Sequence, residues 1–230
     1  MKNIAIITAR GGSKRIPRKN IRLFLGKPII SYSIDAAINS GCFDEVMVST
    51  DDHEIAAIAK KSGAKVPFFR SKINSSDVAT TADVLREVVE EYEKLGKKYE
   101  RICCLYPTAP FVTPQKIKKG LALLDELAVD SIMPVVKFSF PIQRALTLER
   151  GILRFAEPAN ALKRSQDCQE MFHDVGQFYW MKTAEFMTKG EILTEATAGL
   201  VVSGLEVQDI DSETDWKLAE MKFSLMQAPG

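Results

Sequence analysis

The stretch NIAIITARGGSKRIPRKN, residues 3–20, joins a short apolar run to a loop that is rich in cations. Its first part, NIAIITA, is β-branched and nearly continuously apolar, as expected of a strand that is buried on both faces of a sheet. The loop that follows contains two adjacent glycines, five Lys or Arg residues and no acidic residue. A buried strand that runs directly into such a loop is typical of an α/β protein that holds an anion beyond the end of its first strand.

Strand and helix patterns alternate from this first strand to about residue 139. The predicted strands are residues 45–50, 101–108 and 130–139, with a short strand or extended piece at 64–69, and the predicted helices are residues 28–41, 53–63, 80–96 and 113–128. Pro28 at a helix start and Gly41 and Gly63 as helix stops support the assignment, and Thr80 or Thr81 is the expected cap of the third helix. This order predicts an α/β fold with an open, mostly parallel, Rossmann-like sheet and helices on both faces. Ligands bind at the carboxyl ends of such strands.

The alternation stops near Phe140, where a small β-rich insert begins. Residues 144–155 predict a hairpin that turns at Glu149-Arg150-Gly151, and residues 174–182 predict an aromatic strand. We expect a single domain of residues 1–230, with an insert at residues 140–182 that serves as a lid or a dimerisation arm. Residues 205–226, LEVQDIDSETDWKLAEMKFSLM, predict a strand that ends in carboxylates and then a last helix.

The distribution of charge favours a small anionic ligand over a nucleic acid. The net charge is +1, but eight basic residues precede Asp35, the first acidic residue, which leaves 23 basic against 30 acidic residues in the rest of the chain. A nucleic-acid binder is more often basic along a whole face. The chain has 230 residues, 46% of them hydrophobic, so it can bury a substantial core.

The chain carries no pattern of secretion or of membrane insertion. It opens with no basic and apolar leader, and no apolar run approaches the length of a membrane span, so we expect a cytoplasmic protein with no membrane partner. The four cysteines lack the paired spacing of a metal site, and we expect them to be reduced structural thiols. They are Cys42, Cys103, Cys104 and Cys168.

Three kinds of residue in the basic loop suit a phosphate group. Gly11 and Gly12 allow close approach of the backbone, Ser13 adds a hydroxyl, and the cations Arg10, Lys14 and Lys19 can surround the anion. The loop matches neither the spacing of a Walker loop nor that of a dinucleotide fingerprint. The alternative interpretation is a solvated basic turn.

Asp209 and Asp211, in the segment EVQDIDSETDW, form a candidate metal site. In an extended segment they project to the same side, as a hard divalent cation requires, and Mg²⁺ is the natural choice beside phosphates. The alternative is that Asp211 or Ser212 caps the last helix, with Asp215 completing a capping box. His53 and His173 are the only histidines, too few for an ordinary histidine-rich zinc site.

The segment RSQDCQEMFHDVGQFYW, residues 164–180, mixes polar and aromatic side chains that suit a polyhydroxylated, anionic ligand. The side chains concerned are Arg164, Gln166, His173, Gln177, Tyr179 and Trp180. The same pattern also fits the two faces of a half-buried hairpin, and the residues alone leave both interpretations open.

Five motifs, in their order along the chain, resemble the cytidylyltransferases that activate nine-carbon acidic sugars. The motifs are RGGSKRIPRKN (10–20), VSTDD (48–52), NSSDVATTAD (74–83), YPTAP (106–110) and VQDID (207–211). Within that family, FPIQRAL (140–146), and RSQD followed by HDVGQFYW, look like the pseudaminic acid branch rather than the sialic acid branch. The resemblance covers essentially the whole chain. It implies a GT-A-like nucleotidyltransferase that converts CTP and a sugar acid to a CMP-sugar and pyrophosphate, with Mg²⁺ or Mn²⁺. It also implies a homodimer in which the insert reaches across to the partner subunit.

The resemblance assigns roles to individual residues of this chain. Arg10, Lys14 and Lys19 match the family's triphosphate-binding positions, and we expect them to be catalytic. The chemistry does not require a side chain to act as a classical base, and Asp211, acting through a bound water, is our candidate for that role. The nucleotide site it implies contains Ala9, Gly11, Gly12, Ser13 and Asn20, with Arg70, Ala79 and Thr81 at the cytosine. Asp209 and Asp211 match the metal-binding carboxylates. The sugar site it implies contains Tyr106, Gln143, Arg144, Arg164, His173, Gln177 and Tyr179.

Three positions depart from the family pattern. Thr8 replaces a proline, which affects the stiffness of the loop more than its chemistry. Tyr106 stands where sialic acid synthetases have a sugar-contacting Gln, and Val175 replaces a polar residue. Both changes argue against N-acetylneuraminic acid itself as the acceptor. The alternatives are an enzyme that uses legionaminic acid, N-acetylneuraminic acid or a related ulosonic acid, and a nucleotide sensor that performs no catalysis.

Overall fold

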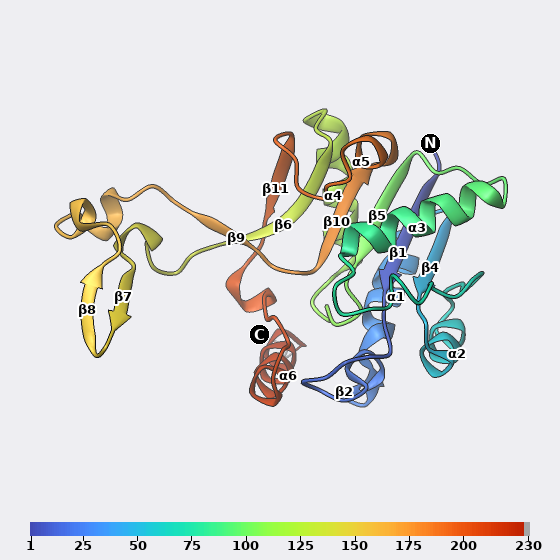
Figure 1. The fold of residues 1–230 in the computed structure, drawn as a ribbon, viewed down its shortest axis with the longest axis horizontal. Helices are drawn as coiled ribbons and strands as arrows, with labels where there is room; N and C mark the ends of the chain where they lie inside the picture. Colours follow the sequence, from blue (N-terminus) through green and yellow to red (C-terminus); the bar gives the residue numbers. More distant parts are fainter. Residues whose placement is uncertain (228–230) are drawn as a thin grey trace.

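The computed structural model describes residues 1–227, and its centre is a seven-stranded mixed sheet (Figure 1). The strands are β1 (Asn3–Thr8), β4 (Glu45–Ser49), β5 (Arg101–Leu105), β6 (Ser131–Lys137), β9 (Phe172–Asp174), β10 (Phe178–Lys182) and β11 (Thr197–Val201). Their order is β11-β6-β10-β5-β1-β4, with β9 also paired to β6. Only β9 and β10 run antiparallel to their neighbours in this sheet. The prediction of an open, mostly parallel sheet is therefore confirmed.

Helices cover both faces of the sheet, as predicted. They are α1 (Ile29–Ser40), α2 (His53–Lys61), α3 (Thr81–Lys94), α4 (Pro114–Glu126) and α5 (Thr183–Lys189). The last helix, α6 (Glu213–Gln227), packs in a separate core rather than on the sheet. Alternate strand residues supply two separate cores, because successive side chains of a strand point to opposite faces. Ala5 and Ile7 of β1 pack with α1, α2 and α4, whereas Ile4 and Ile6 pack with α3 and α5.

Local signals in the sequence set the ends of these helices. Gly41 closes α1 in the left-handed conformation with a φ of 63°. Thr80, rather than Thr81, caps α3 and forms a capping box with Asp83. Thr113 caps α4, and the proline that follows it occupies the first helical position.

Of the two alternatives for residues 64–69, a short strand or an extended piece, the second holds, since the segment forms only a single bridge, between Lys65 and Met47 of β4. Lys65 donates its N–H to the Val46 carbonyl, and Val48 donates its N–H to the Lys65 carbonyl, at 2.9 Å each. The segment therefore adds one bridging residue, rather than a full strand, to the edge of the sheet at β4.

The predicted hairpin is present as β7 (Leu146–Glu149) and β8 (Ile152–Phe155). Its turn lies at Arg150 and Gly151, whose φ angles of 51° and 80° are typical of a two-residue hairpin turn. Figure 1 shows this hairpin projecting away from the sheet, at the end of the chain that leaves β6 and returns as β9. Every residue of β7 is exposed.

The predicted aromatic strand at 174–182 is interrupted by a bulge at residues 175–177. Val135 of β6 pairs with Asp174, and Ile132 of β6 pairs with Trp180. Between these two pairs β6 has only residues 133 and 134, whereas the returning chain has residues 175–179. Gly176 adopts a φ of 61° within the bulge. A bulge re-aims the side chains around it, and this one lies where β9 passes into β10.

The structure corrects the prediction for the last part of the chain. The strand predicted after Leu205 is wrong, because residues 204–206 form a 3-10 turn and residues 207–212 are irregular. The last strand is instead β11, which the apolar pattern missed because its sequence, TAGLV, is rich in small residues. Gly199 is required there, since a Cβ would lie 2.9 Å from a methyl group of Val135. Helix α5 was also not predicted.

Smaller elements complete the fold. A short hairpin of β2 (Leu23–Phe24) and β3 (Lys27–Pro28) packs with α6 through a third core that contains Ile16, Phe24 and Trp216. The 3-10 turns are Lys19–Ile21, Ile142–Arg144, Pro158–Asn160, Ser165–Asp167 and Gly204–Glu206. Within residues 1–227, no helix has both the length and the apolar character that crossing a bilayer requires.

Candidate active site

The chain that follows β4 holds the basic loop at the carboxyl end of β1. Gly11 donates its N–H to Asp51 Oδ1 at 2.9 Å. A Cβ on Gly11 would lie 2.9 Å from Asp52 Oδ2, so a larger residue does not fit at this position. Asn20 is buried, and its side-chain amide donates to the Arg10 carbonyl at 2.8 Å. These contacts fix the loop backbone at the edge of the sheet.

Asp52 links the loop to the first turn of α2. Its carboxylate accepts the N–H groups of Glu54 and Ile55 at 2.9 Å each, which caps the helix. Arg18, whose φ is 55°, donates to both Asp52 oxygens at 2.5 and 3.1 Å and also binds Glu54. The hydrogen bonds from Arg18 lower the pKa of Asp52 to about 2, so this carboxyl group is ionised at neutral pH.

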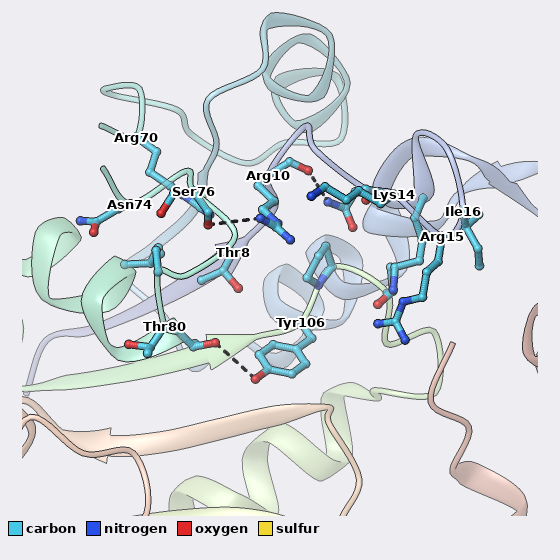
Figure 2. Close-up of a pocket in the computed structure, with 18 residues that line it drawn as sticks. Thr8, Arg10, Lys14, Arg15, Ile16, Arg70, Asn74, Ser76, Thr80 and Tyr106 are labelled. Carbon is cyan, nitrogen blue, oxygen red and sulfur yellow. Dashed lines mark hydrogen bonds between the residues drawn. The ribbon is translucent and has the colours of Figure 1, made fainter. Parts of the chain in front are cut away.

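A cavity of about 460 Å³ opens beside the loop, and Arg10, Lys14 and Lys19 all line it (Figure 2). Arg10 donates to Asp77 at 2.7 Å and to the Ser76 carbonyl at 3.2 Å. Lys14 binds the other oxygen of Asp77 at 2.5 Å. Lys14 and Arg10 together lower the pKa of Asp77, so the two cations share one ionised carboxylate. The arrangement already holds one anionic group between Arg10 and Lys14.

The opposite side of the cavity is less charged and more enclosed. Figure 2 shows Arg70 and Asn74 on this side, across from Lys14 and Arg15. Arg70 is only 8% exposed and donates to the hydroxyl and the carbonyl of Ser49 at 3.0 and 2.6 Å. Burial lowers the pKa of Arg70 to about 10, so it is still a cation at neutral pH. The lining continues through Ala79, Thr80 and Thr81 at the start of α3.

A second cavity, of about 690 Å³, shares Tyr106 with the first. Its lining comes from the end of β6, from β9 and its bulge, and from residues 204–209. Tyr106 is fixed through its backbone, because Ser33 donates to its carbonyl at 2.8 Å and its N–H donates to the Gln177 carbonyl at 2.9 Å. Its ring meets Tyr179 edge-on, with 5.5 Å between the ring centres. The two cavities therefore meet at Tyr106.

Residues 207–212 close the site from the C-terminal part of the chain. Lys19 donates to the Ile210 carbonyl at 2.7 Å and lies 3.5 Å from Asp211, which also binds Arg15 at 2.8 Å. Asp209 lines the second cavity. The segment thus lies beside both the basic loop and the second cavity.

The start of α6 is capped by residues other than the two candidate metal ligands. Ser212 Oγ accepts the Asp215 N–H at 3.2 Å, and the Asp215 carboxylate accepts the Ser212 N–H at 2.8 Å. This reciprocal pair satisfies the helix end without the carboxylates of Asp209 and Asp211.

The family model described as Cytidylyltransferase matches residues 4–179, which include the basic loop, Arg70 and Tyr106. The chain belongs to the cytidylyltransferase family. Two curated relatives cover almost its whole length. A pseudaminic acid cytidylyltransferase from Campylobacter jejuni subsp. jejuni is 39% identical over 226 residues, which cover 98% of this chain and 97% of the relative. A CMP-N,N'-diacetyllegionaminic acid synthase from Legionella pneumophila subsp. pneumophila is 31% identical over 233 residues, which cover 99% of this chain and 98% of the relative.

Solved structures share the fold of this cytidylyltransferase. CMP:2-keto-3-deoxy-manno-octonic acid synthetase complexed with CTP superposes with a TM-score of 0.71, covering 98% of this chain and 100% of that chain. The two sequences are 18% identical, so the likeness supports the architecture alone.

In this cytidylyltransferase the predicted nucleotide residues come together around one cavity. The lining includes Arg10, Ser13, Lys14, Lys19, Asn20, Arg70, Ala79 and Thr81. Ala9, Gly11 and Gly12 belong to the same loop, and Ala9 itself is buried. Tyr106, His173 and Tyr179 line the second cavity. Gln177 lines neither cavity; it is buried and donates to the Glu206 carbonyl at 2.6 Å.

Three predicted sugar-binding residues lie on the projecting insert instead. Gln143 donates to the Gln169 carbonyl at 2.9 Å, Arg144 donates to Ser165 at 3.2 Å, and Arg164 binds Asp167 at 2.8 Å. None of the three lines either cavity of its own subunit. The predicted placement of these three residues at the sugar is therefore not seen within one chain.

Sequence patterns did not assign roles to several residues of the site. Asp51 and Asp52 follow β4, the strand parallel to β1, so the rule that ligands bind at the carboxyl ends of parallel strands could have singled them out. Asp77 gave no such signal, because its contact with Arg10 joins residues 67 positions apart in a loop without regular structure.

Proposed function

We propose that this protein transfers the cytidylyl group of CTP to pseudaminic acid and releases pyrophosphate. The observation that carries the proposal is the pair of adjoining cavities that share Tyr106, with the three loop cations in one and a polar, aromatic lining in the other. Family membership supports the nucleotide, and the relative named for pseudaminic acid supports the acceptor.

The proposed reaction is in-line attack of the sugar's anomeric hydroxyl on the α-phosphate of CTP, with the hydroxyl proton passing through a bound water to Asp211. Pyrophosphate leaves toward Arg10 and Lys14, which already hold the carboxylate of Asp77 between them. Lys19 neutralises charge at the α-phosphate, and its contact with the Ile210 carbonyl sets its position. Phosphoryl transfer depends mainly on positioning and on charge stabilisation, which these fixed cations supply.

We also propose that Asp209 and Asp211 bind Mg²⁺ or Mn²⁺ together with phosphate oxygens. Their carboxylates fit a hard cation, and Ser212 and Asp215 cap α6 in their place. Among residues 1–227, no group of three or more His, Cys, Asp or Glu side chains is arranged to bind a metal. Magnesium is commonly held by one or two carboxylates and the substrate phosphates, which suits this pair. The bound ion would supply charge for the α-phosphate and lower the pKa of the attacking hydroxyl.

The remaining part of the proposal concerns assembly and compartment. We propose a homodimer in which the insert of each subunit covers the second cavity of the other, which would bring Gln143, Arg144 and Arg164 to the sugar. Large apolar side chains of the insert support this, since Leu148 is 67% and Leu162 is 98% exposed in a single subunit. We place the enzyme in the cytoplasm, and the four free cysteines are consistent with a reducing compartment.

The test is pyrophosphate release from CTP with Mg²⁺ and, in separate reactions, pseudaminic, legionaminic and N-acetylneuraminic acid. UTP and ATP are the nucleotide controls, and chelation of the metal is the third control. We expect release with CTP and pseudaminic acid and a loss of release on chelation. Measurable CTP binding without release with any of the acids would favour a nucleotide sensor and would contradict the proposal.

A further inference from the structure

Asp174 lies in the second cavity at the end of β9, immediately before the bulge. Its Oδ1 accepts the N–H of Gly176 at 2.9 Å, and its Oδ2 accepts the hydroxyl of Tyr179 at 2.5 Å. Each carboxylate oxygen is thus held by a donor from the same short segment. The side chain has one fixed orientation at the cavity wall.

Both donors are themselves fixed. The Tyr179 ring is buried, and burial, followed by the neighbouring Tyr106, raises the pKa of Tyr179 well above its usual range. Its hydroxyl therefore stays protonated and donates to Asp174. Gly176 turns back toward Asp174 with a φ of 61°, a conformation that favours glycine. An ionised carboxylate offers about four acceptor positions, so these two bonds leave about two for a ligand.

The negative charge of Asp174 determines which groups of a sugar acid it attracts and which it repels. The acid's own carboxylate is repelled by Asp174. Hydroxyl and amide N–H groups are attracted, because hydrogen bonds to an ionised acceptor are stronger than those between neutral groups. Lys137, a basic residue of the same wall, is paired with Glu170. Asp174 is therefore suited to the end of the sugar that carries donors rather than to its carboxylate.

We propose that Asp174 is a specificity-determining residue that accepts a hydrogen bond from a hydroxyl or amide N–H group of the acceptor sugar. This inference rests on the proposed function, since it concerns the acceptor cavity of that reaction. The bond orients the sugar with its carboxylate away from Asp174. Because the carboxylate is already held by Tyr179 and Gly176, little freedom is lost when the sugar binds.

Steady-state kinetics of Asp174→Ala and Asp174→Asn test the inference. We expect the KM for pseudaminic acid to rise by about 10- to 100-fold in the alanine variant, as loss of a hydrogen bond to a charged group predicts. The KM for CTP should stay within about twofold of wild type, because only acceptor binding is affected. The preference for pseudaminic over N-acetylneuraminic acid should also change, a result that a purely structural role would not produce. Glu91→Gln, which alters a half-exposed carboxylate paired with Lys94 on α3, is the matched control and should behave as wild type.

Two results would overturn the inference. One is an acceptor KM in Asp174→Ala that equals the wild-type value. The other is an equal loss for every acceptor together with weaker CTP binding, which would indicate that Asp174 only supports the fold. If thermal unfolding shows that the alanine variant is destabilised, the asparagine variant decides, because it keeps the size and one acceptor oxygen of the side chain. Failure of the proposed function gives a different result from failure of this inference. In that case the wild-type protein would bind CTP in calorimetry but release no pyrophosphate with any acid.

Discussion

Lys14 and Asp211 are the residues through which the proposed chemistry can be tested most simply. The Lys14 side chain is 76% exposed, so its removal leaves the core intact. We expect Lys14→Ala and Asp211→Ala each to lower the turnover rate on the order of 100- to 1000-fold, as loss of a charged transition-state contact does. Pyrophosphate release measures the rate, and circular dichroism should show an unchanged fold.

Lys60→Ala is the control for the charge change, because Lys60 is an exposed residue of α2. It should retain wild-type activity. Near-normal turnover in the Lys14 or Asp211 variant, with CTP and Mg²⁺ saturating, would show that the assignment of these residues is wrong.

Asp77 should act as an internal competitor of the triphosphate. It binds both Arg10 and Lys14, so its carboxylate competes with phosphate oxygens for these cations. We expect Asp77→Asn to bind CTP and pyrophosphate up to about fivefold more tightly, the scale of an exposed ion pair. Isothermal titration calorimetry measures the change, and Asp35→Asn, which alters the surface pair with Lys27, is the control. Weaker CTP binding would instead mean that Asp77 helps to hold the nucleotide.

Glu45, at the amino end of β4, is a residue whose contacts with other elements stabilise the fold. It is buried and accepts hydrogen bonds from Tyr92 of α3 at 2.6 Å and from Tyr99 at 3.2 Å, and it binds Lys97 at 3.0 Å and Lys65 at 3.2 Å. Burial alone would raise the pKa of Glu45, but these donors outweigh it and lower the pKa to about 2. A carboxyl group whose pKa falls on folding stabilises the protein at any pH above its unfolded pKa.

The pH dependence follows from that shift. The contribution of Glu45 is complete near pH 7 and is lost as the pH falls from about 4.5 toward about 2. We expect Glu45→Gln to lower the free energy of unfolding on the order of 2 to 3 kcal/mol at pH 7. The difference from wild type should shrink by more than half at pH 3. Urea unfolding at both pH values measures it, and an equal difference at the two would contradict the proposed ionic origin.

The elements that could be predicted are those whose own residues specify them. β1 is a continuous apolar run, α3 has an amphipathic pattern with Thr80 before it, and the β7–β8 turn has Arg150-Gly151. β11 could not be predicted in the same way, because its strand character comes from pairing with β6 rather than from its own small residues. The position of β10 between β5 and β6 likewise depends on where the insert returns to the sheet.

The same distinction applies to the site. Arg10, Lys14 and Lys19 could be placed at an anion because they follow a buried strand within one loop. Asp52 binds that loop from 34 positions further along the chain, and Asp77 binds it from 63 and 67 positions further along. No periodic pattern in the sequence predicts contacts over such separations. Local sequence therefore predicted the cations of the site, and Asp211 beside Lys19, but not Asp52 or Asp77.

The whole molecule has one feature that a single subunit leaves unexplained, the exposed insert. Its hairpin packs few of its apolar side chains, and Leu148 and Ile152 are 67% and 59% exposed. We expect Leu148→Glu to convert the proposed dimer of 25.6 kDa subunits to a monomer, because a charge would be buried in the interface. Light scattering after size-exclusion chromatography measures the mass, and the KM for the acceptor should rise with dissociation.

Leu95→Glu, at the exposed end of α3, is the control and should leave the mass unchanged. A wild-type protein that is a monomer at micromolar concentration and fully active would contradict the dimer and the role of Arg144 and Arg164.

The proposed function is tested most directly by asking whether this enzyme prefers pseudaminic acid to related acids. A competition reaction tests it, in which CTP, Mg²⁺ and equal amounts of pseudaminic, legionaminic and N-acetylneuraminic acid are supplied together. The nucleotide products are separated by liquid chromatography against a standard of each CMP-sugar and identified by mass spectrometry. We expect CMP-pseudaminic acid to be the main product and to appear together with pyrophosphate. A main product built on either of the other acids would contradict the acceptor assignment, and the absence of any CMP-sugar would contradict the reaction itself.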